Sequence, residues 1–288
     1  MKYDYTIIST IKDEPDIVKV IISVAHLMVP PQAWYIFYDG IDVYFLKKLL
    51  DYKRDYEYLN IKVFTHTDFQ SQADFYYTRI ANNLNFVYSQ ITEEDKNVNF
   101  IMKLDGDTIL FYDYVDRLYS LMQKENLGCV SGRIQCTTTT GTVIENRDRN
   151  YSIGTGMLIK PHVLEYLGGY PNFPASDTII NIAANYLGYT TKQVDELMIT
   201  QTRLTCGNSR YNRTLTTAIK QYYLRYPLPL VLLLVFRRDR KNLVYLIKIL
   251  FKIKNEQRFN NKELIRFNNR NVIRLAVNKF IKKIIKKI

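Results

Sequence analysis

Two aspartates that directly follow an apolar run have the types and the spacing of a metal site. Asp105 and Asp107 stand in the segment Leu104-Asp105-Gly106-Asp107, and the run before them is residues 99–103. Alternate side chains of a strand point to the same face, so we expect both carboxylates to project together from the end of one strand. Mg²⁺ is commonly held by one or two carboxylates together with substrate phosphates. The pair therefore indicates a site for a divalent cation and a nucleotide diphosphate.

The same residues also fit a β-hairpin. Asp-Gly between two apolar runs is typical of a two-residue turn, and residues 109–111 would then form the returning strand. A short motif is decided by its structural context. The segments on either side of it therefore have to choose between the two interpretations.

Strand-like and helix-like segments alternate along the N-terminal part of the chain. The strand-like segments are 5–9, 33–38, 61–65, 99–103, 129–144 and 151–160, and the helix-like segments are 17–27, 44–50, 74–88, 114–124, 161–167 and 178–187. This order predicts an α/β fold with a mostly parallel central sheet flanked by helices. Such sheets bind ligands at the carboxyl ends of their strands, where Thr10, Asp39 and Asp105 fall. Ser176 is expected to be the N-cap of the helix at 178–187.

Charge divides the chain into two physically different parts. The net charge is +12, but residues 237–288 hold 17 Lys/Arg and 3 Asp/Glu, which leaves residues 1–236 at −2. We therefore predict a catalytic domain at 1–215 and a basic helical extension at 216–288. Three cysteines (Cys129, Cys136 and Cys206) lack metal-ligand spacing, and the N-terminus lacks the pattern of a signal peptide. Both observations favour a reduced, cytoplasmic setting.

The basic extension has the pattern of a membrane-surface segment. The apolar run 227–236 is ten residues long, whereas a spanning helix needs about 20. Five apolar residues recur at helical spacing among lysines near the end of the chain: Ile273, Val277, Ile281, Ile284 and Ile288. A basic amphipathic helix of this kind lies in a membrane interface.

Two other partners fit the extension. Its apolar faces could instead pack on the catalytic domain or on a second copy of the chain, which would make a homo-oligomer. Nucleic acid is compatible with the charge, but no recognised DNA- or RNA-binding module accompanies it, so we do not expect it as a partner.

The order of the motifs resembles the family 2 glycosyltransferases, which have the GT-A fold. The resemblance covers roughly residues 3–210 and is carried by these segments: 7–14 (IISTIKDE), 38–40 (YDG), 104–107 (LDGD), 154–159 (GTGMLI), 167–170 (LGGY), and Asp177 before a helix that ends at 187–189 (LGY). Lys12 and Ser176 depart from the family's pattern, since the family usually has Asn and an acid there. The resemblance implies a GT-A catalytic domain and favours the metal-site interpretation of the aspartate pair.

The resemblance assigns five residues to the nucleotide-sugar donor. Thr10 and Asp39 would contact the nucleotide base, and Arg79 would lie near the nucleotide. Asp105 would lie at the ribose and share in metal binding, while Asp107 would ligate Mg²⁺ or Mn²⁺ held by the diphosphate. From the residues alone, Asp39 also fits a turn cap and Arg79 an exposed helix position.

The acceptor side follows from the later motifs. Gly154, Thr155 and Gly156 would line it, and Asp177 would be the general base; the alternatives are a strand bend for the glycines and a helix-capping carboxylate for Asp177. Arg203 or Arg210 could contact phosphate from a segment that closes over the donor, or belong to a solvated loop.

The resemblance implies a metal-dependent, inverting, hexosyltransferase-type enzyme. It would move a sugar from a nucleotide-sugar donor to a glycan or lipid-linked acceptor, peripheral on the inner face of the membrane. A nucleotidyltransferase on a similar fold and a non-catalytic membrane adaptor are the alternatives.

Overall fold

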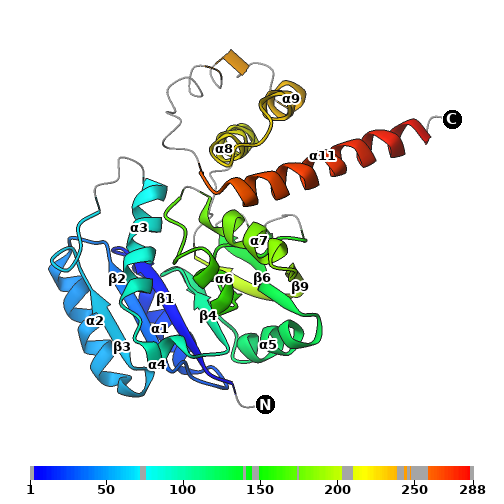
Figure 1. Cartoon of the computed structure of the whole chain (residues 1–288). Coiled ribbons are helices and arrows are strands. Elements are labelled where there is room, and N and C mark those ends of the chain that lie inside the picture. The colour runs from blue at the N-terminus through cyan, green and yellow to red at the C-terminus, as the bar shows by residue number, and fades with distance from the viewer. Residues whose placement is uncertain are drawn as a thin grey trace. The chain divides into compact units, whose positions relative to one another are not determined.

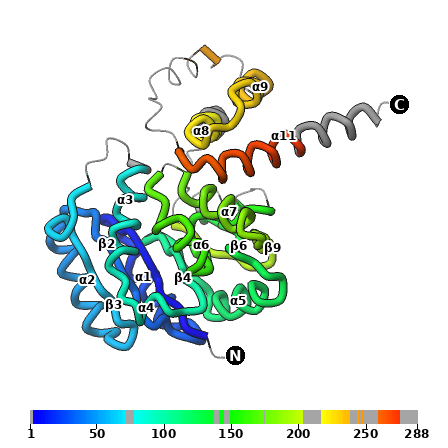
Figure 2. Tube along the Cα trace, viewed as in Figure 1, coloured from blue at the N-terminus to red at the C-terminus, as the bar shows by residue number. Residues whose placement is uncertain are grey.

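The chain folds into two compact units, Met1–Leu204 and Thr205–Ile288. The computed structural model describes residues 3–71, 76–138, 141–144, 149–173, 175–202, 210–238, 243–244, 247 and 259–285, which Figure 1 shows in colour, and Figure 2 draws the Cα trace in the same view. The predicted domain boundary at residue 215 would fall inside helix α8 (Arg210–Tyr223), whereas the two units divide before it.

One half of the central sheet of the first unit is parallel, as the alternating pattern predicts. Its strands are β1 (Tyr5–Ile11), β2 (Ala33–Tyr38), β3 (Ile61–Phe64) and β4 (Phe100–Lys103), in the order β3-β2-β1-β4. The helices around them are α1 (Ile17–Ala25), α2 (Val43–Asp55) and α3 (Tyr76–Ser89), with a 3-10 turn at Glu57–Leu59 (Figure 1). Ile7, Trp34 and Ile36 belong to the core shared with α1, while Phe37 packs edge-on against Phe86 of α3. Strands β1, β2 and β4 are therefore buried on both faces, as parallel strands usually are, whereas β3 is mostly half-buried.

The other half of the sheet is mixed, so the prediction of a mostly parallel sheet is wrong there. Beyond β4 the order is β8 (Met157–Ile159), β6 (Leu127–Thr138), β9 (Thr190–Gln201) and β5 (Thr108–Ile109), with β7 (Gly141–Ile144) paired to β6. Strand β8 is antiparallel to both β4 and β6. The chain runs from β6 to β8 with no crossover helix in the described residues, and an antiparallel arrangement needs none.

Three more helices of the first unit accompany this half: α5 (Tyr114–Lys124), α6 (Pro161–Tyr166) and α7 (Ser176–Tyr186). The predicted strand at 151–160 is reduced to Met157–Ile159, because residues 151–156 form bends. The N-cap of α7 is Ala175, without a side-chain hydrogen bond, and Ser176 is already helical. The prediction that Ser176 caps this helix is therefore wrong.

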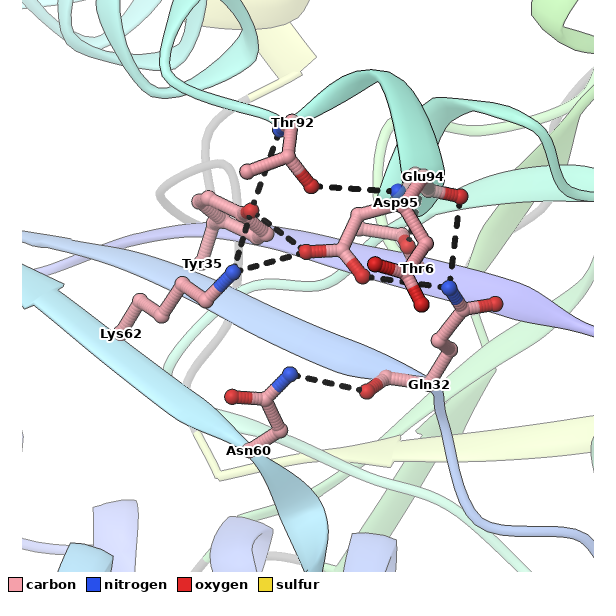
Figure 3. A network of polar contacts seen from close by, with 8 residues as sticks. All are labelled: Thr6, Gln32, Tyr35, Asn60, Lys62, Thr92, Glu94 and Asp95. Atoms are coloured by element: carbon pink, nitrogen blue, oxygen red, sulfur yellow. Dashed lines mark hydrogen bonds and ion pairs between the residues drawn. The ribbon is translucent and has the colours of Figure 1, made fainter.

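A buried polar network anchors the short helix α4 (Glu93–Lys96) to the sheet (Figure 3). Tyr35 Oη donates to Asp95 Oδ2 at 2.6 Å, Lys62 Nζ lies 2.7 Å from the same oxygen, and Gln32 Nε2 donates to Oδ1 at 3.2 Å. The Thr6 hydroxyl donates to the Asp95 carbonyl oxygen at 2.7 Å. Both carboxylate oxygens are thus satisfied inside the protein.

The charges of this network support one another. Burial alone would raise the pKa of Asp95, but Lys62, Tyr35 and Thr92 hold that pKa below its usual range. Burial likewise opposes the charge of Lys62, yet Asp95 and Tyr35 raise the pKa of Lys62 overall. The network therefore stabilises the ionised pair, which is the condition for burying it.

The second unit is helical in its described residues. It contains α8, α9 (Leu228–Arg238) and α11 (Lys262–Ile285), and Ala218 of α8 packs with Val231 and Val235 of α9. The apolar run 227–236 thus forms most of α9. None of the helices in the described ranges combines the length and apolar content that a membrane crossing requires. The predicted amphipathic face extends beyond the described side chains, so it remains a prediction.

Candidate active site at the carboxyl end of strand β4

The turn after β4 presents the aspartate pair. The Thr108 amide donates to the Asp105 carbonyl oxygen at 3.1 Å, which closes a turn over Asp105-Gly106-Asp107. A Cβ on Gly106 would lie 2.6 Å from Ile11 Cγ2, so only glycine lets this turn approach β1. The following strand β5 pairs with β9 and not with β4. The hairpin interpretation of the motif is therefore wrong.

Strand β9 and the segment before β8 hold the pair in place. Gln201 Nε2 donates to Asp107 Oδ1 at 3.3 Å, and the Thr202 amide donates to the Asp107 carbonyl oxygen at 3.1 Å. The Asp105 backbone amide donates to Thr155 Oγ1 at 3.1 Å, so Thr155 of the predicted acceptor side contacts the turn that carries Asp105 and Asp107. Asp107 is buried, with 5% of its surface exposed, whereas 33% of the Asp105 side chain is exposed.

A buried lysine that sequence reasoning missed stands beside Asp105. The Lys103 ammonium forms an ion pair with Asp105 Oδ1, and only 8% of the Lys103 side chain is exposed. Burial alone would lower the pKa of Lys103, but Asp105, Tyr170 and Asp177 raise it overall. Burial also raises the pKa of Tyr170 to about 12, which keeps this phenol neutral. The signal for Lys103 was its place two residues before Asp105, on the same face of the strand.

Asp177 lies at the start of α7 and against the predicted acceptor segment. A Cβ on Gly154 would lie 3.4 Å from Asp177 Oδ2, which is ordinary van der Waals contact, so the two residues are direct neighbours. One turn later in α7, the side-chain Nδ2 of Asn181 donates to the backbone carbonyl oxygen of Asp177 at 2.7 Å and to that of Ser152 at 3.1 Å. The Ser152 amide donates back to Asn181 Oδ1 at 2.9 Å. Asn181 therefore fixes the helix start against the segment that carries Gly154.

Tyr114 of α5 fixes the other end of this segment. Its hydroxyl donates to the Gly156 carbonyl oxygen at 2.7 Å and accepts from the Gly132 amide at 2.8 Å. Gly156 has φ +57°, a conformation that favours glycine. The two glycines thus serve a bend next to Asp177, and the structure brings Gly154, Thr155 and Gly156 to the aspartates.

Asp39 follows β2 and is held by two basic side chains. His66 Nε2 lies 3.1 Å from Asp39 Oδ1, and Arg79 Nε lies 3.0 Å from Asp39 Oδ2. The Arg79 contact is an ion pair, and Asp39 Oδ1 makes no hydrogen bond among the described residues. Arg79 is thus not simply an exposed helix residue, and His66 is a neighbour that sequence reasoning missed.

Two residues, one in β1 and one in α3, carry buried polar atoms without a partner in the described part of the chain. The buried Oγ1 of Thr10 has no hydrogen-bond partner in the described part of the chain. Asn83, which lies one helical turn after Arg79, is fully buried, and neither atom of its amide has a described partner. Buried polar atoms are normally paired, so these positions are consistent with a polar ligand. The side chains of Arg203 and Arg210 lie outside the described residues.

The aspartate pair suits a cation that is shared with a substrate. Within the described residues no group of three or more His, Cys, Asp or Glu is arranged to hold a metal. Mg²⁺ rarely uses such a closed protein site and is more often held by one or two carboxylates plus phosphates. Asp107 and the exposed part of Asp105 fit that second arrangement.

Comparison with known proteins identifies the fold. No protein-family model matches the sequence, and no curated protein matches it. Among solved structures, a mannosyltransferase from Pyrobaculum calidifontis in complex with GDP-Man and Mn²⁺ superposes with TM-score 0.57 at 13% identity, over 88% of this chain and 74% of that one. The chain has a glycosyltransferase fold. S. aureus TarS (residues 1–349) in complex with UDP-GlcNAc is similar at TM-score 0.53 and 11% identity, over 88% of this chain and 77% of that one.

Proposed function

We propose that the protein is a metal-dependent, inverting glycosyltransferase of the GT-A type. It transfers a sugar, of hexosyl type, from a nucleotide-sugar donor to a glycan or lipid-linked acceptor. The observation that carries the proposal is the meeting of the Asp105–Asp107 turn, the Gly154–Gly156 segment and Asp177 around Lys103. Residues from three separate segments thus form one polar site at the carboxyl end of β4, where α/β sheets bind ligands.

The donor side of the site carries carboxylates, which a divalent cation bound to a diphosphate would require as further ligands. Asp107 would ligate the cation directly, and Asp105 would contact the ribose and a metal-bound water. When bound, Mg²⁺ or Mn²⁺ would offset the charge that develops on the departing nucleoside diphosphate. Thr10 and Asp39 would contact the nucleotide's base, and Arg79 would lie near the nucleotide.

Asp177 would act on the acceptor. Its carboxylate stands at a helix start, where the ionised form is favoured. It would accept the proton of the acceptor hydroxyl as that oxygen attacks the anomeric carbon. Attack from the face opposite the leaving group inverts that carbon.

The similar structures support a nucleotide-sugar donor and a divalent cation. One of them contains GDP-Man and Mn²⁺, and another contains UDP-GlcNAc. Because these two structures contain nucleotide sugars with different bases, the donor of this protein has to be found by experiment.

The test of the proposed reaction is a donor screen. Purified protein would be incubated with a panel of nucleotide sugars, including GDP-mannose and UDP-GlcNAc, with Mn²⁺ or Mg²⁺ and with a chelator. We expect one donor to release its nucleoside diphosphate only with metal. Pyrophosphate release from a sugar phosphate and a nucleoside triphosphate would favour a nucleotidyltransferase instead.

We also propose that the second unit holds the enzyme at the inner, cytoplasmic face of a membrane. The excess of basic residues in 237–288 supports this, since each basic residue near an anionic leaflet contributes on the order of 1 kcal/mol. Flotation with anionic liposomes, compared between the full chain and a chain without residues 227–288, tests it. Equal flotation of the two proteins would refute docking through this unit.

A further inference from the structure

Lys103 is a buried ammonium between apolar neighbours in the sheet. Its partners in the same row of the sheet are Ile8 of β1 and Met157 of β8. Lysine is almost never buried to this degree unless it is paired. An apolar side chain would pack well between Ile8 and Met157. The charged ammonium of Lys103 therefore has to be stabilised by the polar groups near it.

Those groups come from both halves of the proposed site. The ammonium pairs with Asp105 on the donor side, and the Asp105 backbone amide donates to Thr155 Oγ1. Gly154, next to Thr155, lies against Asp177 on the acceptor side, and Asp177 also raises the pKa of Lys103. Asp105 keeps a third of its side chain exposed (33%), whereas Lys103 keeps 8%. The lysine therefore supports Asp105 from the protein's interior and leaves the outer part of that carboxylate open to a ligand.

The formal charges of the site show what Lys103 changes. Asp105, Asp177 and Lys103 together carry −1, a small excess of negative charge that favours a cation. Without the lysine the two carboxylates would carry −2. Charges interact strongly at the low effective dielectric of a buried site, so this single positive charge affects both cation binding and the placement of the carboxylates.

We propose that Lys103 is a positioning residue that links the donor side of the site to its acceptor side. It holds Asp105 from within and offsets the charge of Asp105 beside Asp177, so that each carboxylate meets its own substrate in a fixed place. The role rests on the proposed function, but it also makes a claim about cation binding that needs no donor sugar.

The test compares a neutral and a charged replacement. Lys103→Met removes the charge and keeps a long, apolar stem, while Lys103→Arg keeps the charge. Mn²⁺ alone would be titrated into each protein by calorimetry. We expect Lys103→Met to bind Mn²⁺ at least about fivefold more tightly than wild type, because a nearby positive charge is gone. Lys103→Arg should bind Mn²⁺ within about twofold of wild type.

Turnover supplies the second readout. We expect Lys103→Met to lower kcat about tenfold or more while the donor KM changes less than about threefold, because the carboxylates lose their fixed positions but the base site is untouched. Combining Lys103→Met with Asp105→Asn should lower kcat no further than Asp105→Asn alone, because the two residues act as a pair. If Lys103→Met does not fold, Lys103→Gln keeps a hydrogen-bond donor for Asp105 and should show the same gain in Mn²⁺ affinity.

Each contrary result has a separate meaning. Equal Mn²⁺ affinity of wild type and the neutral variants, or tighter binding by Lys103→Arg as well, would overturn the role of Lys103. Absence of Mn²⁺ binding in every protein would remove the metal site and this inference with it. Intact Mn²⁺ binding by a wild type that turns over no donor would overturn the proposed function alone.

Discussion

Two buried groups of Lys, Asp and Tyr lie on one face of the same sheet, and they differ in how their charges balance. Lys62, Tyr35, Ile8 and Lys103 are successive partners across β3, β2, β1 and β4, so both lysines stand in one row. Lys62 is matched by Asp95 alone, and every oxygen of that carboxylate is satisfied. Lys103 pairs with Asp105, and Asp177 also raises the pKa of Lys103, so one positive charge serves two carboxylates.

The difference separates a structural pair from a site. A buried ion pair with all its hydrogen bonds made has nothing left to bind and can only stabilise or orient the fold. A cluster with excess negative charge and a partly exposed carboxylate still requires a positive partner. The first group should therefore affect stability and the second activity, and the following changes test that division.

The largest effect is expected at Asp107. Asp107→Ala removes the carboxylate proposed to ligate the cation, so we expect donor turnover to fall at least about 100-fold. Kinetics at saturating Mn²⁺ would measure it. Asp55→Ala, at an exposed carboxylate of α2, is the matched control and should leave turnover unchanged. Near-normal turnover by Asp107→Ala would remove Asp107 from the site.

Asp95→Asn should act on stability instead. It removes the partner of Lys62 and of Tyr35, so we expect the free energy of unfolding to fall by about 2–3 kcal/mol, with turnover within about twofold of wild type. Denaturant titration measures the first quantity. The exposed neighbour Glu94→Gln is the control. A loss of activity without a loss of stability would contradict the assignment of a purely structural role to the group around Asp95.

Thr155→Val tests the support of the donor-side turn. The valine keeps the shape of Thr155 but removes the acceptor for the Asp105 amide, so we expect a loss of about 1–2 kcal/mol in the free energy of unfolding. Denaturant titration again measures it. Because the amide positions Asp105, turnover should fall as well, and unchanged turnover would show that this hydrogen bond does not serve the site.

The smallest effect is a dependence on pH. The pKa of Asp95 is lowered in the folded protein, so its stabilising contribution is present above the unfolded value of 3.8 and is lost as pH falls through the folded value. The difference in unfolding free energy between wild type and Asp95→Asn should therefore be constant between about pH 5 and 8 and shrink below about pH 4. A difference that grows on acidification would contradict the ionised pair.

Local patterns in the sequence predicted many of the elements and the position of the aspartate pair at a strand end. The bounds of β2 and α5 match the predicted segments 33–38 and 114–124, because alternation and helical spacing are local signals. The aspartate pair was placed at a strand end for the same reason. Asp177 and Gly154 lie close together. No local signal links the two residues, and only the order of the motifs suggested that they belong to one site.

Signals that depend on tertiary pairing were missed. The antiparallel placement of β8 follows from which strand it meets, and nothing within residues 151–160 specifies that partner. Ser176 fits an N-cap by type, but the helix starts one residue earlier than that role needs. Lys103 reads as an ordinary residue of a strand until Asp105 and Asp177 are seen around it.

The most direct test of the account is nucleoside diphosphate release by wild type and Asp177→Asn. Both would be assayed with the donor found in the screen, with Mn²⁺ and an acceptor present. The account predicts metal-dependent release by wild type and a loss of about 100-fold or more in Asp177→Asn, at unchanged thermal stability. Equal release by the two proteins would contradict the assignment of this site as the place of glycosyl transfer.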